Sequence, residues 1–139
     1  MKSLENARNF FRNCESGKGW EACKEYVQGN GKFDCQSEPF AEVKEIKDYT
    51  EAMAGLANST MPGSSFEIHA SALDEKTNTV LVFATFIGTH SGEGGPIPPT
   101  NKTTNSHYVF AMEMNEQDLV QSITKVWNSS WAFKELGWM

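Results

Sequence analysis

The residues able to carry acid–base or metal chemistry in this chain are few and far apart. The three histidines are His69, His90 and His107, and no pair of them has the i, i+4 spacing of a helical metal site. A zinc site needs three or four convergent ligands, so we expect no bound metal. The glycines at 92, 94 and 95 are followed by prolines and not by Gly-Lys-Ser/Thr, so we expect no phosphate-binding loop and no cofactor.

Acid–base catalysis would therefore depend on single side chains. In the alternating segment 66–70, His69 and Glu67 share one face if Phe66 and Ile68 share the other. Asp34 lies in a predicted short strand, 32–36, and is expected near the mouth of a cavity. We take His69, Asp34 and Glu67 as candidate catalytic residues, although alternation alone leaves open which face points inward. No Ser-His-Asp or Cys-His arrangement is recognisable.

The elements that must position these residues follow from periodicity and from turn signals. Apolar residues at helical spacing predict helices, the first beginning with Ser3 as N-cap and the third with Asp48 as N-cap. Gly29-Asn30-Gly31 predicts a turn. Helices that precede long hairpins indicate an α+β fold. The predicted helices span 3–15, 20–27, 49–57 and 131–136, and the predicted strands span 32–36, 66–73, 79–90, 104–115 and 118–128.

The segment 85–100 runs an apolar strand into a stiff Gly/Pro loop, which we expect to rim a binding site. Within it, Gly88-Thr89-His90-Ser91-Gly92 and Ile97-Pro98-Pro99-Thr100 resemble the GTHTG…GIPPTG signature of SnoaL-like polyketide cyclases, in the nuclear-transport-factor-2-like superfamily. Val126-Trp127-Asn128 and Lys134-Glu135-Leu136-Gly137 resemble the last strand and closing helix of that family. In such a turn, we expect the His90 ring to bond to the backbone.

The resemblance implies a single domain over 1–139. Its fold would be a curved, mostly antiparallel sheet, a cone or half-barrel, packed on three helices around an apolar cavity. Family members are often dimers, so a homodimer is expected. The fold is shared by proteins with many tasks, so the activity does not follow from it.

The resemblance also implies where catalytic groups would lie. In the cyclases a carboxylate near the end of the last strand removes a proton next to a carbonyl, with a histidine on the preceding strand. These positions fall on Asn128 and near Phe110, and neither side chain can exchange a proton at neutral pH. The chain is thus expected to lack the acid–base pair. A carboxyl introduced by Asn128→Asp should have its pKa raised by burial.

Rings and thioethers are numerous enough to line the implied cavity, with Tyr49, Tyr108 and Asn128 as polar tips. We expect a protein that binds a small apolar or aromatic molecule. The alternatives are a cofactor-free cyclase or isomerase acting next to a carbonyl, and a dimeric interaction protein with a filled cavity. The expected ligand-binding residues are Trp20, Tyr49, Met53, Tyr108, Phe110, Met112, Asn128 and Trp131.

Composition limits the partners. The net charge is −6 and the pI is near 5.0, which argues against nucleic-acid binding. No apolar run approaches the length of a membrane span, and the polar start does not resemble a signal peptide. Cys14, Cys23 and Cys35 have no CxxC spacing and indicate reduced thiols in a cytoplasmic protein.

Overall fold

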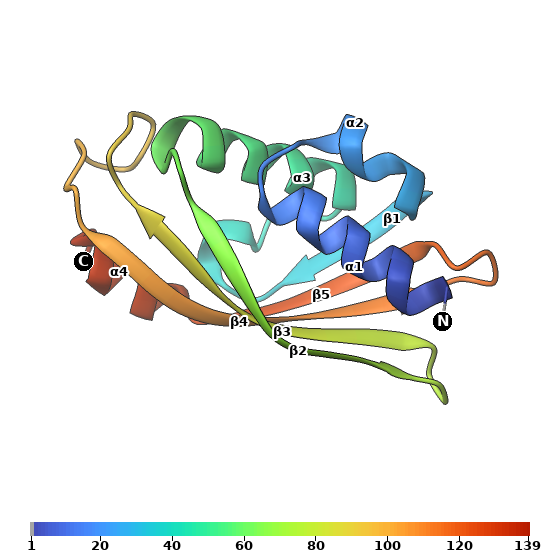
Figure 1. The fold of residues 1–139 in the computed structure, drawn as a ribbon. Helices are drawn as coiled ribbons and strands as arrows, with labels where there is room; N and C mark the ends of the chain where they lie inside the picture. The colour runs from blue at the N-terminus through green and yellow to red at the C-terminus, as the bar shows by residue number, and fades with distance from the viewer. Residues whose placement is uncertain (1) are drawn as a thin grey trace.

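The computed structural model describes residues 2–139. Helices cover one face of a curved five-stranded sheet (Figure 1). Most predicted elements are present, and the strands after residue 60 lie within about two residues of their predicted bounds. In chain order the elements are α1 (Lys2–Glu15), α2 (Trp20–Cys23), the 3-10 turn η1 (Lys24–Tyr26), β1 (Val27–Cys35), the 3-10 turn η2 (Glu38–Phe40), α3 (Ile46–Gly55), the π turn η3 (Leu56–Thr60), β2 (Ser65–Asp74), β3 (Thr79–Thr89), β4 (Thr103–Met114), β5 (Val120–Trp127) and α4 (Ser129–Leu136).

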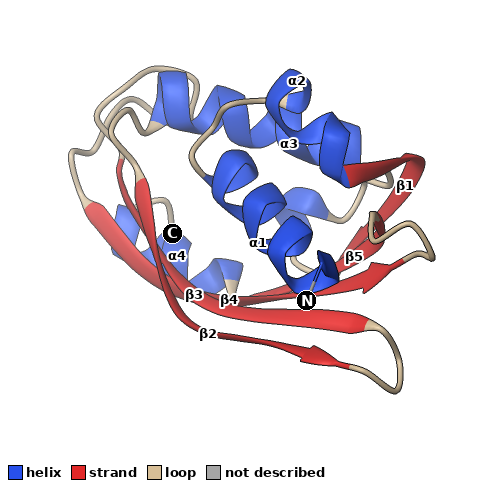
Figure 2. Ribbon diagram, turned by 45° about the vertical axis from the view of Figure 1, so that its right-hand side comes forward, coloured by secondary structure: helices blue, strands red, loops and turns tan. Residues whose placement is uncertain are grey.

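The strand order is β1-β5-β4-β3-β2, and the sheet does not close into a barrel. All neighbours are antiparallel except β1 and β5, which run parallel, so the sheet is mixed. The helices α1, α2 and α3 lie over the concave face, while α4 packs beside β4 (Figure 2). The expected α+β class and cone-like shape are confirmed.

Alternation along the long strands separates the two faces of the sheet. On β4 the buried residues include Thr104, Ser106, Tyr108 and Phe110, whereas His107 between them is exposed. Helix α1 presents Ala7, Phe10, Phe11 and Cys14 to the inner face, as its periodicity predicted. The core therefore lies between α1, α3 and the inner face of the sheet.

The predicted turn at Gly29-Asn30-Gly31 is wrong, because β1 runs through it with an irregular register between Val27 and Lys32. Glycine is needed there for packing. A Cβ atom on Gly31 would lie 2.7 Å from Ile46 Cδ1 at the start of α3. The glycine thus lets α3 approach the strand closely, which is a second common use of glycine in a sheet.

Two predicted helix caps are also wrong. Ser3 lies inside α1, and its hydroxyl donates to Asp118 Oδ1 at 2.7 Å, which ties the helix to the β4–β5 turn. Asp48 lies in the first turn of α3, whose N-cap is Glu45 without a side-chain bond. The capping pattern misplaced the start of α3, because the helix already begins at the fully buried Ile46, two residues before Asp48.

No helix within residues 2–139 has the length and apolar character needed to cross a membrane.

Candidate functional site

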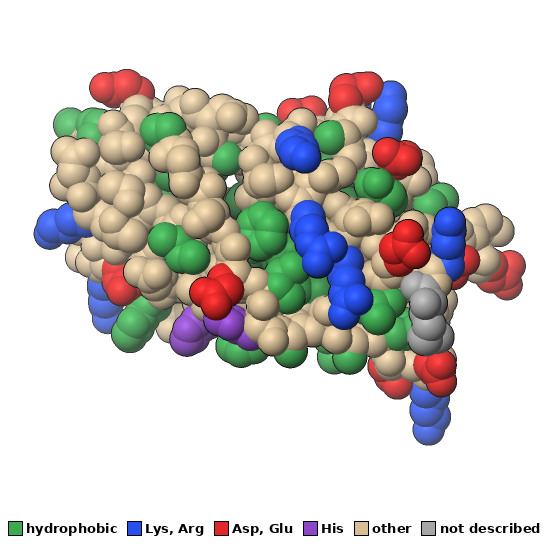
Figure 3. Space-filling model, in the orientation of Figure 1, with side chains coloured by type: hydrophobic (Ala, Val, Ile, Leu, Met, Phe, Trp, Pro, Cys, Tyr) green, Lys and Arg blue, Asp and Glu red, His purple; other side chains and the backbone are tan. Residues whose placement is uncertain are grey.

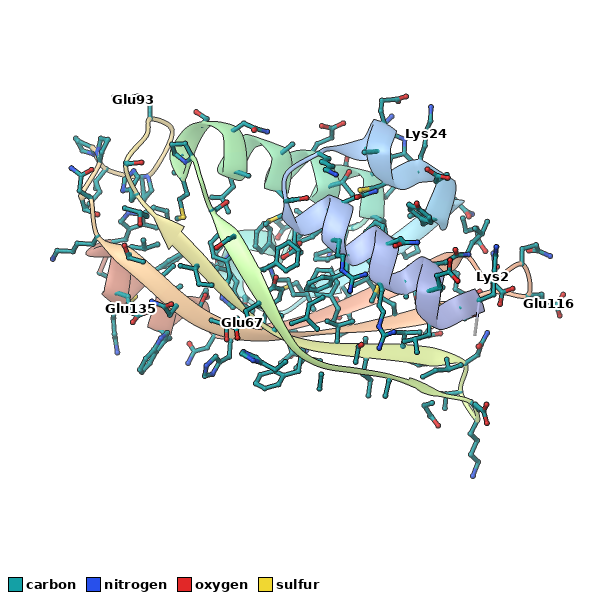
Figure 4. All side chains as sticks on the ribbon, viewed as in Figure 1. Lys2, Lys24, Glu67, Glu93, Glu116 and Glu135 are labelled. Atoms are coloured by element: carbon teal, nitrogen blue, oxygen red, sulfur yellow. The ribbon has the colours of Figure 1, made fainter. Side chains whose placement is uncertain are left out.

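A cavity of about 110 Å³ lies between α3, the inner face of the sheet and α4. Figure 4 shows side chains from the helices and from the sheet meeting in the interior of the molecule. Most of its wall is apolar, so water gains few partners inside it. Its lining residues are Glu15, Pro39, Phe40, Met53, Leu56, Met61, Phe86, Thr104, Tyr108, Lys125, Trp127, Ala132, Phe133, Leu136 and Trp138.

Four polar side chains form one connected cluster at the base of the cavity, and we call it the inner cluster: Glu15, Tyr49, Tyr108 and Lys125. The Tyr108 hydroxyl donates to Glu15 Oε1 at 2.6 Å, and the Tyr49 hydroxyl donates to Glu15 Oε2 at 3.0 Å. Lys125 Nζ donates to the Tyr49 oxygen at 2.9 Å. The Glu15 carboxylate thus accepts hydrogen bonds from both phenols. Tyr49 also connects this carboxylate to the Lys125 amine.

Local structure explains why these polar groups point inward. Glu15 is the last residue of α1 and lies one helical turn after Phe11, on the buried side of the helix. On β5 the residues Ile123, Lys125 and Trp127 share the inner face by alternation. Lys125 pairs with Phe110 across β4, so its side chain enters the aromatic interior.

Five aromatic rings surround the amine of Lys125. Its Nζ lies 4.5 Å from the centroid of Phe40, 4.8 Å from Trp127 and 4.9 Å from Tyr49. Tyr108 follows at 5.2 Å and Phe110 at 6.0 Å. Ring faces attract a cation, so they offset part of the cost of removing the ammonium from water.

Burial governs the proton affinities in the inner cluster. Burial lowers the pKa of Lys125 below its ordinary 10.5, although the negative charge of Glu15 acts in the opposite direction. Burial, and then Glu15, raises the pKa of Tyr49 and of Tyr108 well above 10.0. At neutral pH both phenols therefore keep their protons, and the amine is easier to deprotonate than a surface lysine.

The expected ligand-binding residues divide into three groups. Met53 and Tyr108 line the cavity, and Tyr49 belongs to the inner cluster directly beneath it. Phe110 and Met112 are fully buried core residues, and Trp20 packs half-buried against the core, so these three lie outside the cavity wall.

Asn128 and Trp131 are not where the sequence placed them. Asn128 is exposed, and its side chain caps α4 by accepting from the Trp131 backbone N–H at 3.1 Å. The Trp131 ring is 55% exposed and donates to the Asn105 carbonyl. The expectation that an amide occupies the cavity is therefore wrong. The inward residues at this end of β5 are Lys125 and Trp127.

The three candidate catalytic residues also lie outside the cavity. Asp34 and Glu67 are exposed, and Figure 4 marks Glu67 on the side of the sheet away from the interior. His69 sits at an irregularity between Ile68 and Ala70, and its Nε2 lies 2.7 Å from Thr85 Oγ1 on the outer face. The irregularity turns Ala70 outward as well, so the simple alternation assumed for 66–70 fails there.

Sequence reasoning missed Glu15 and Lys125, the two charged members of the inner cluster. A signal existed for each of them. Glu15 continues the apolar side of α1 one turn beyond Phe11, and Lys125 shares the parity of Ile123 and Trp127. Charged residues are rarely buried without a partner, so neither residue was considered for the interior.

The Gly/Pro loop, residues 88–100, does not line the cavity but packs against elements that do. A Cβ atom on Gly92 would lie 1.8 Å from the Ser59 carbonyl oxygen, so the loop packs tightly on the π turn after α3. The His90 ring accepts from the Trp138 indole N–H at 2.9 Å through Nδ1 and makes no bond to the backbone, contrary to expectation. Trp138 itself lines the cavity, and so does Leu136, whose carbonyl accepts from the Thr100 hydroxyl at the end of the loop.

No group of three or more His, Cys, Asp or Glu residues within 2–139 is arranged to hold a metal ion. The cysteines are free, and all three are buried.

Together, the open curved sheet, the helices on its concave face and the cavity between them define a nuclear-transport-factor-2-like fold. The sequence matches no family model and no curated protein. Similar solved structures include a candidate polyketide cyclase from Acidithiobacillus ferrooxidans, with a TM-score of 0.79 and 16% identity over 99% of this chain and 95% of that chain. A candidate SnoaL-like polyketide cyclase from Jannaschia sp. CCS1 has a TM-score of 0.77 and 14% identity over 97% and 91%. An LEH-like epoxide hydrolase from M. tuberculosis has a TM-score of 0.69 and 10% identity over 97% of this chain and 89% of that chain. The expected resemblance to SnoaL-like proteins is confirmed at the level of the fold.

Proposed function

We propose that this protein binds a small, mostly apolar molecule in its cavity, with one polar group of the ligand facing the inner cluster. The observation that carries the proposal is an apolar cavity whose base holds a buried amine hydrogen-bonded to a buried phenol. Such a combination of apolar walls and a few fixed polar groups is typical of small-molecule sites.

The cavity volume limits the ligand. A dry apolar cavity of about 150 Å³ holds one benzene molecule. At about 110 Å³, the site here suits a single ring or a short branched chain. A fused polycyclic polyketide would require the surrounding side chains to move. The proposed ligand is therefore of one-ring size.

Binding can be tested with benzyl alcohol and toluene, followed by calorimetry or ligand-observed NMR. Ala132 lines the cavity from α4, so Ala132→Leu should fill part of it and weaken binding of both probes about tenfold or more. Ala52→Leu on the exposed side of α3 is the matched control and should bind like the unaltered protein. Equal affinities for all three proteins would contradict the proposal.

A second candidate function is a cofactor-free enzyme acting next to a carbonyl. One acidic and one basic side chain, Glu15 and Lys125, reach the cavity, and Tyr49 joins them by hydrogen bonds. The resemblance places the cyclase acid–base pair on Asn128 and near Phe110, whose side chains exchange no proton at neutral pH, so we infer that any such chemistry here uses other residues. This candidate shares its site with the binding proposal.

We also propose that a second copy of this chain covers the outer face of the sheet. Phe83, Val109 and Val126 lie in one row across β3, β4 and β5, and Phe83 and Val126 are 41% and 63% exposed. A contiguous apolar row on a sheet face is typical of a self-complementary interface. Light scattering should show a dimer that Val126→Asp converts to a monomer, and a monomeric unaltered protein would contradict this.

A further inference from the structure

The amine of Lys125 combines burial with an incomplete set of partners. It is 6% exposed, and neither ion pair within residues 2–139 involves it. An ammonium carries three N–H donors, and the Tyr49 oxygen accepts one of them. The rings of Phe40, Tyr108 and Trp127 around it also line the cavity. A molecule in the cavity would therefore lie against the amine.

A route for the ammonium proton leads away from the cavity. Lys125 Nζ donates to the Tyr49 oxygen, and the Tyr49 hydroxyl donates to Glu15 Oε2. A concerted shift along these two bonds gives a neutral amine, an intact phenol and a protonated Glu15. The second oxygen of Glu15 keeps its bond from Tyr108 throughout. The cluster thus contains both a proton acceptor and the path to it.

Charge and solvation around the amine act in opposite directions, and solvation dominates. The ionisable groups that face Lys125 are Glu15 and Cys14 from α1, Tyr49 from α3, Tyr108 from β4 and Cys35 from β1. Glu15 and the two thiols favour the charged amine, yet burial outweighs them and lowers the pKa of Lys125. Desolvated lysines of this kind act as nucleophiles toward carbonyl carbons.

We propose that Lys125 condenses with an aldehyde or ketone held in the cavity and forms an imine with it. This inference rests on the proposed function, because the carbonyl compound must first bind there. It assigns the substrate class, a one-ring-sized aldehyde or ketone, and makes Lys125 the residue that bonds to it.

The steps balance without any further reactant. The ammonium proton passes through Tyr49 to Glu15, and the nitrogen lone pair then attacks the carbonyl carbon. A C–N bond forms, the C=O π electrons move to oxygen, and the ammonium proton of the adduct transfers to that oxygen to give a neutral carbinolamine. Glu15 returns its proton through Tyr49 to the hydroxyl group, the C–O bond breaks and water leaves. The products are an iminium ion on Lys125 and one water molecule, with the total charge unchanged.

An iminium ion withdraws electrons from the carbon next to it more strongly than the parent carbonyl does. A C–H or C–C bond at that carbon is therefore weakened, and a nearby base can complete the reaction. The proposal thus gives Lys125 a role in the second candidate function, the cofactor-free enzyme acting next to a carbonyl. The base that takes the proton from carbon can again be Glu15, which lines the same cavity.

The test uses benzaldehyde as the carbonyl probe and sodium cyanoborohydride to reduce any imine to a stable benzylamine. We expect mass spectrometry to find a benzyl group on Lys125, formed about tenfold or more faster than on any exposed lysine. Benzyl alcohol should slow this labelling by competing for the cavity. The advantage of Lys125 over exposed lysines should grow as the pH falls from about 10 to 7, because its pKa is lowered.

Four variants complete the test. Lys125→Arg keeps the positive charge and Lys125→Met keeps an apolar chain of similar length, and both should lose the site-specific label. Lys47→Arg, on an exposed position of α3, is the matched control and should be labelled at Lys125 as before. Tyr49→Phe should slow labelling about a hundredfold, with a changed pH profile, because the proton route is cut.

Two negative outcomes are distinguishable. If benzyl alcohol binds but the benzyl label spreads evenly over exposed lysines, the imine proposal is overturned and the binding proposal stands. If neither benzyl alcohol nor toluene binds and Lys125 is not labelled, both proposals are overturned.

Discussion

Two clusters on opposite faces of the same sheet combine aromatic rings with ionisable groups, yet they differ in what surrounds them. The inner cluster is buried beneath α1 and α3. The outer cluster consists of His69, Phe83 and His107, whose rings lie 5.0 to 6.4 Å apart on exposed strand positions. Figure 3 shows the histidine side chains at the lower surface of the molecule, in contact with solvent.

The comparison shows that burial matters more than residue type. Histidine is the usual acid–base residue near neutral pH, which made His69 the natural candidate from sequence. Solvent contacts the outer cluster, whereas the carboxylate and the amine of the inner cluster are desolvated and each is bonded to a phenol. Perturbed proton affinities in a cavity are a better indicator of a functional site than histidines on a wet surface.

The largest expected difference between the clusters is in stability. Glu15→Ala would leave two buried phenols without their acceptor and Lys125 without the nearby negative charge, so we expect a loss of about 3–5 kcal/mol in unfolding free energy. His69→Ala on the outer face should cost about 1 kcal/mol, since it removes one partly buried hydrogen bond. Urea denaturation measures both values.

Glu15→Gln is the control for shape, because it keeps the side-chain volume and one acceptor oxygen while it removes the charge. It should fall between the unaltered protein and Glu15→Ala. Equal stabilities of Glu15→Ala and His69→Ala would show that the inner cluster is solvated, and the contrast between the two faces would be lost.

A smaller effect concerns pH. The folded-state pKa of Lys125 is lowered from 10.5, so between the folded and unfolded pKa values the unfolded chain binds more protons. The contribution of Lys125 to stability is therefore fully present above about pH 10.5, and it is lost as the pH falls through the folded pKa. Lys125→Met has no ionisable group at this position and therefore lacks this pH-dependent contribution. The unfolding free energy of the unaltered protein minus that of Lys125→Met should rise with pH up to about 10.5 and then level off.

The difference between the two proteins is the appropriate measure, because Tyr49 and Tyr108 act in the opposite direction. Their pKa values are raised, so the folded state holds their protons longer, and stability falls above about pH 10 in both proteins alike. Denaturation at a series of pH values supplies the comparison, and a flat difference would mean that the Lys125 amine is hydrated.

Much of the fold was predictable because its signals are local. Strands β2 to β5 follow from β-rich runs between turn residues, and the inward face of α1 follows from its periodicity. The site was not predictable in the same way. Whether Glu15 is buried depends on Tyr49, 34 positions away, and on Tyr108, 93 positions away. A charged residue is assigned to solvent by default, and only the packed structure reveals partners at that separation.

Substitutions at Asn128 should have the smallest effect on stability. For Asn128→Asp, the structure reverses the pKa shift that was expected from the sequence. A carboxyl placed there by Asn128→Asp was expected to have its pKa raised in a cavity. The position is instead exposed and caps α4, where backbone N–H groups and the helix dipole favour a negative charge. The pKa of the new carboxyl should therefore lie below about 3.9, and NMR titration measures it.

The stability of Asn128→Asp near neutral pH should barely change, whereas Asn128→Ala should cost about 1 kcal/mol by removing the cap. A raised pKa would mean that residue 128 is buried in the interior. Lys125 would then not lie on the inner face of β5, contrary to the structure.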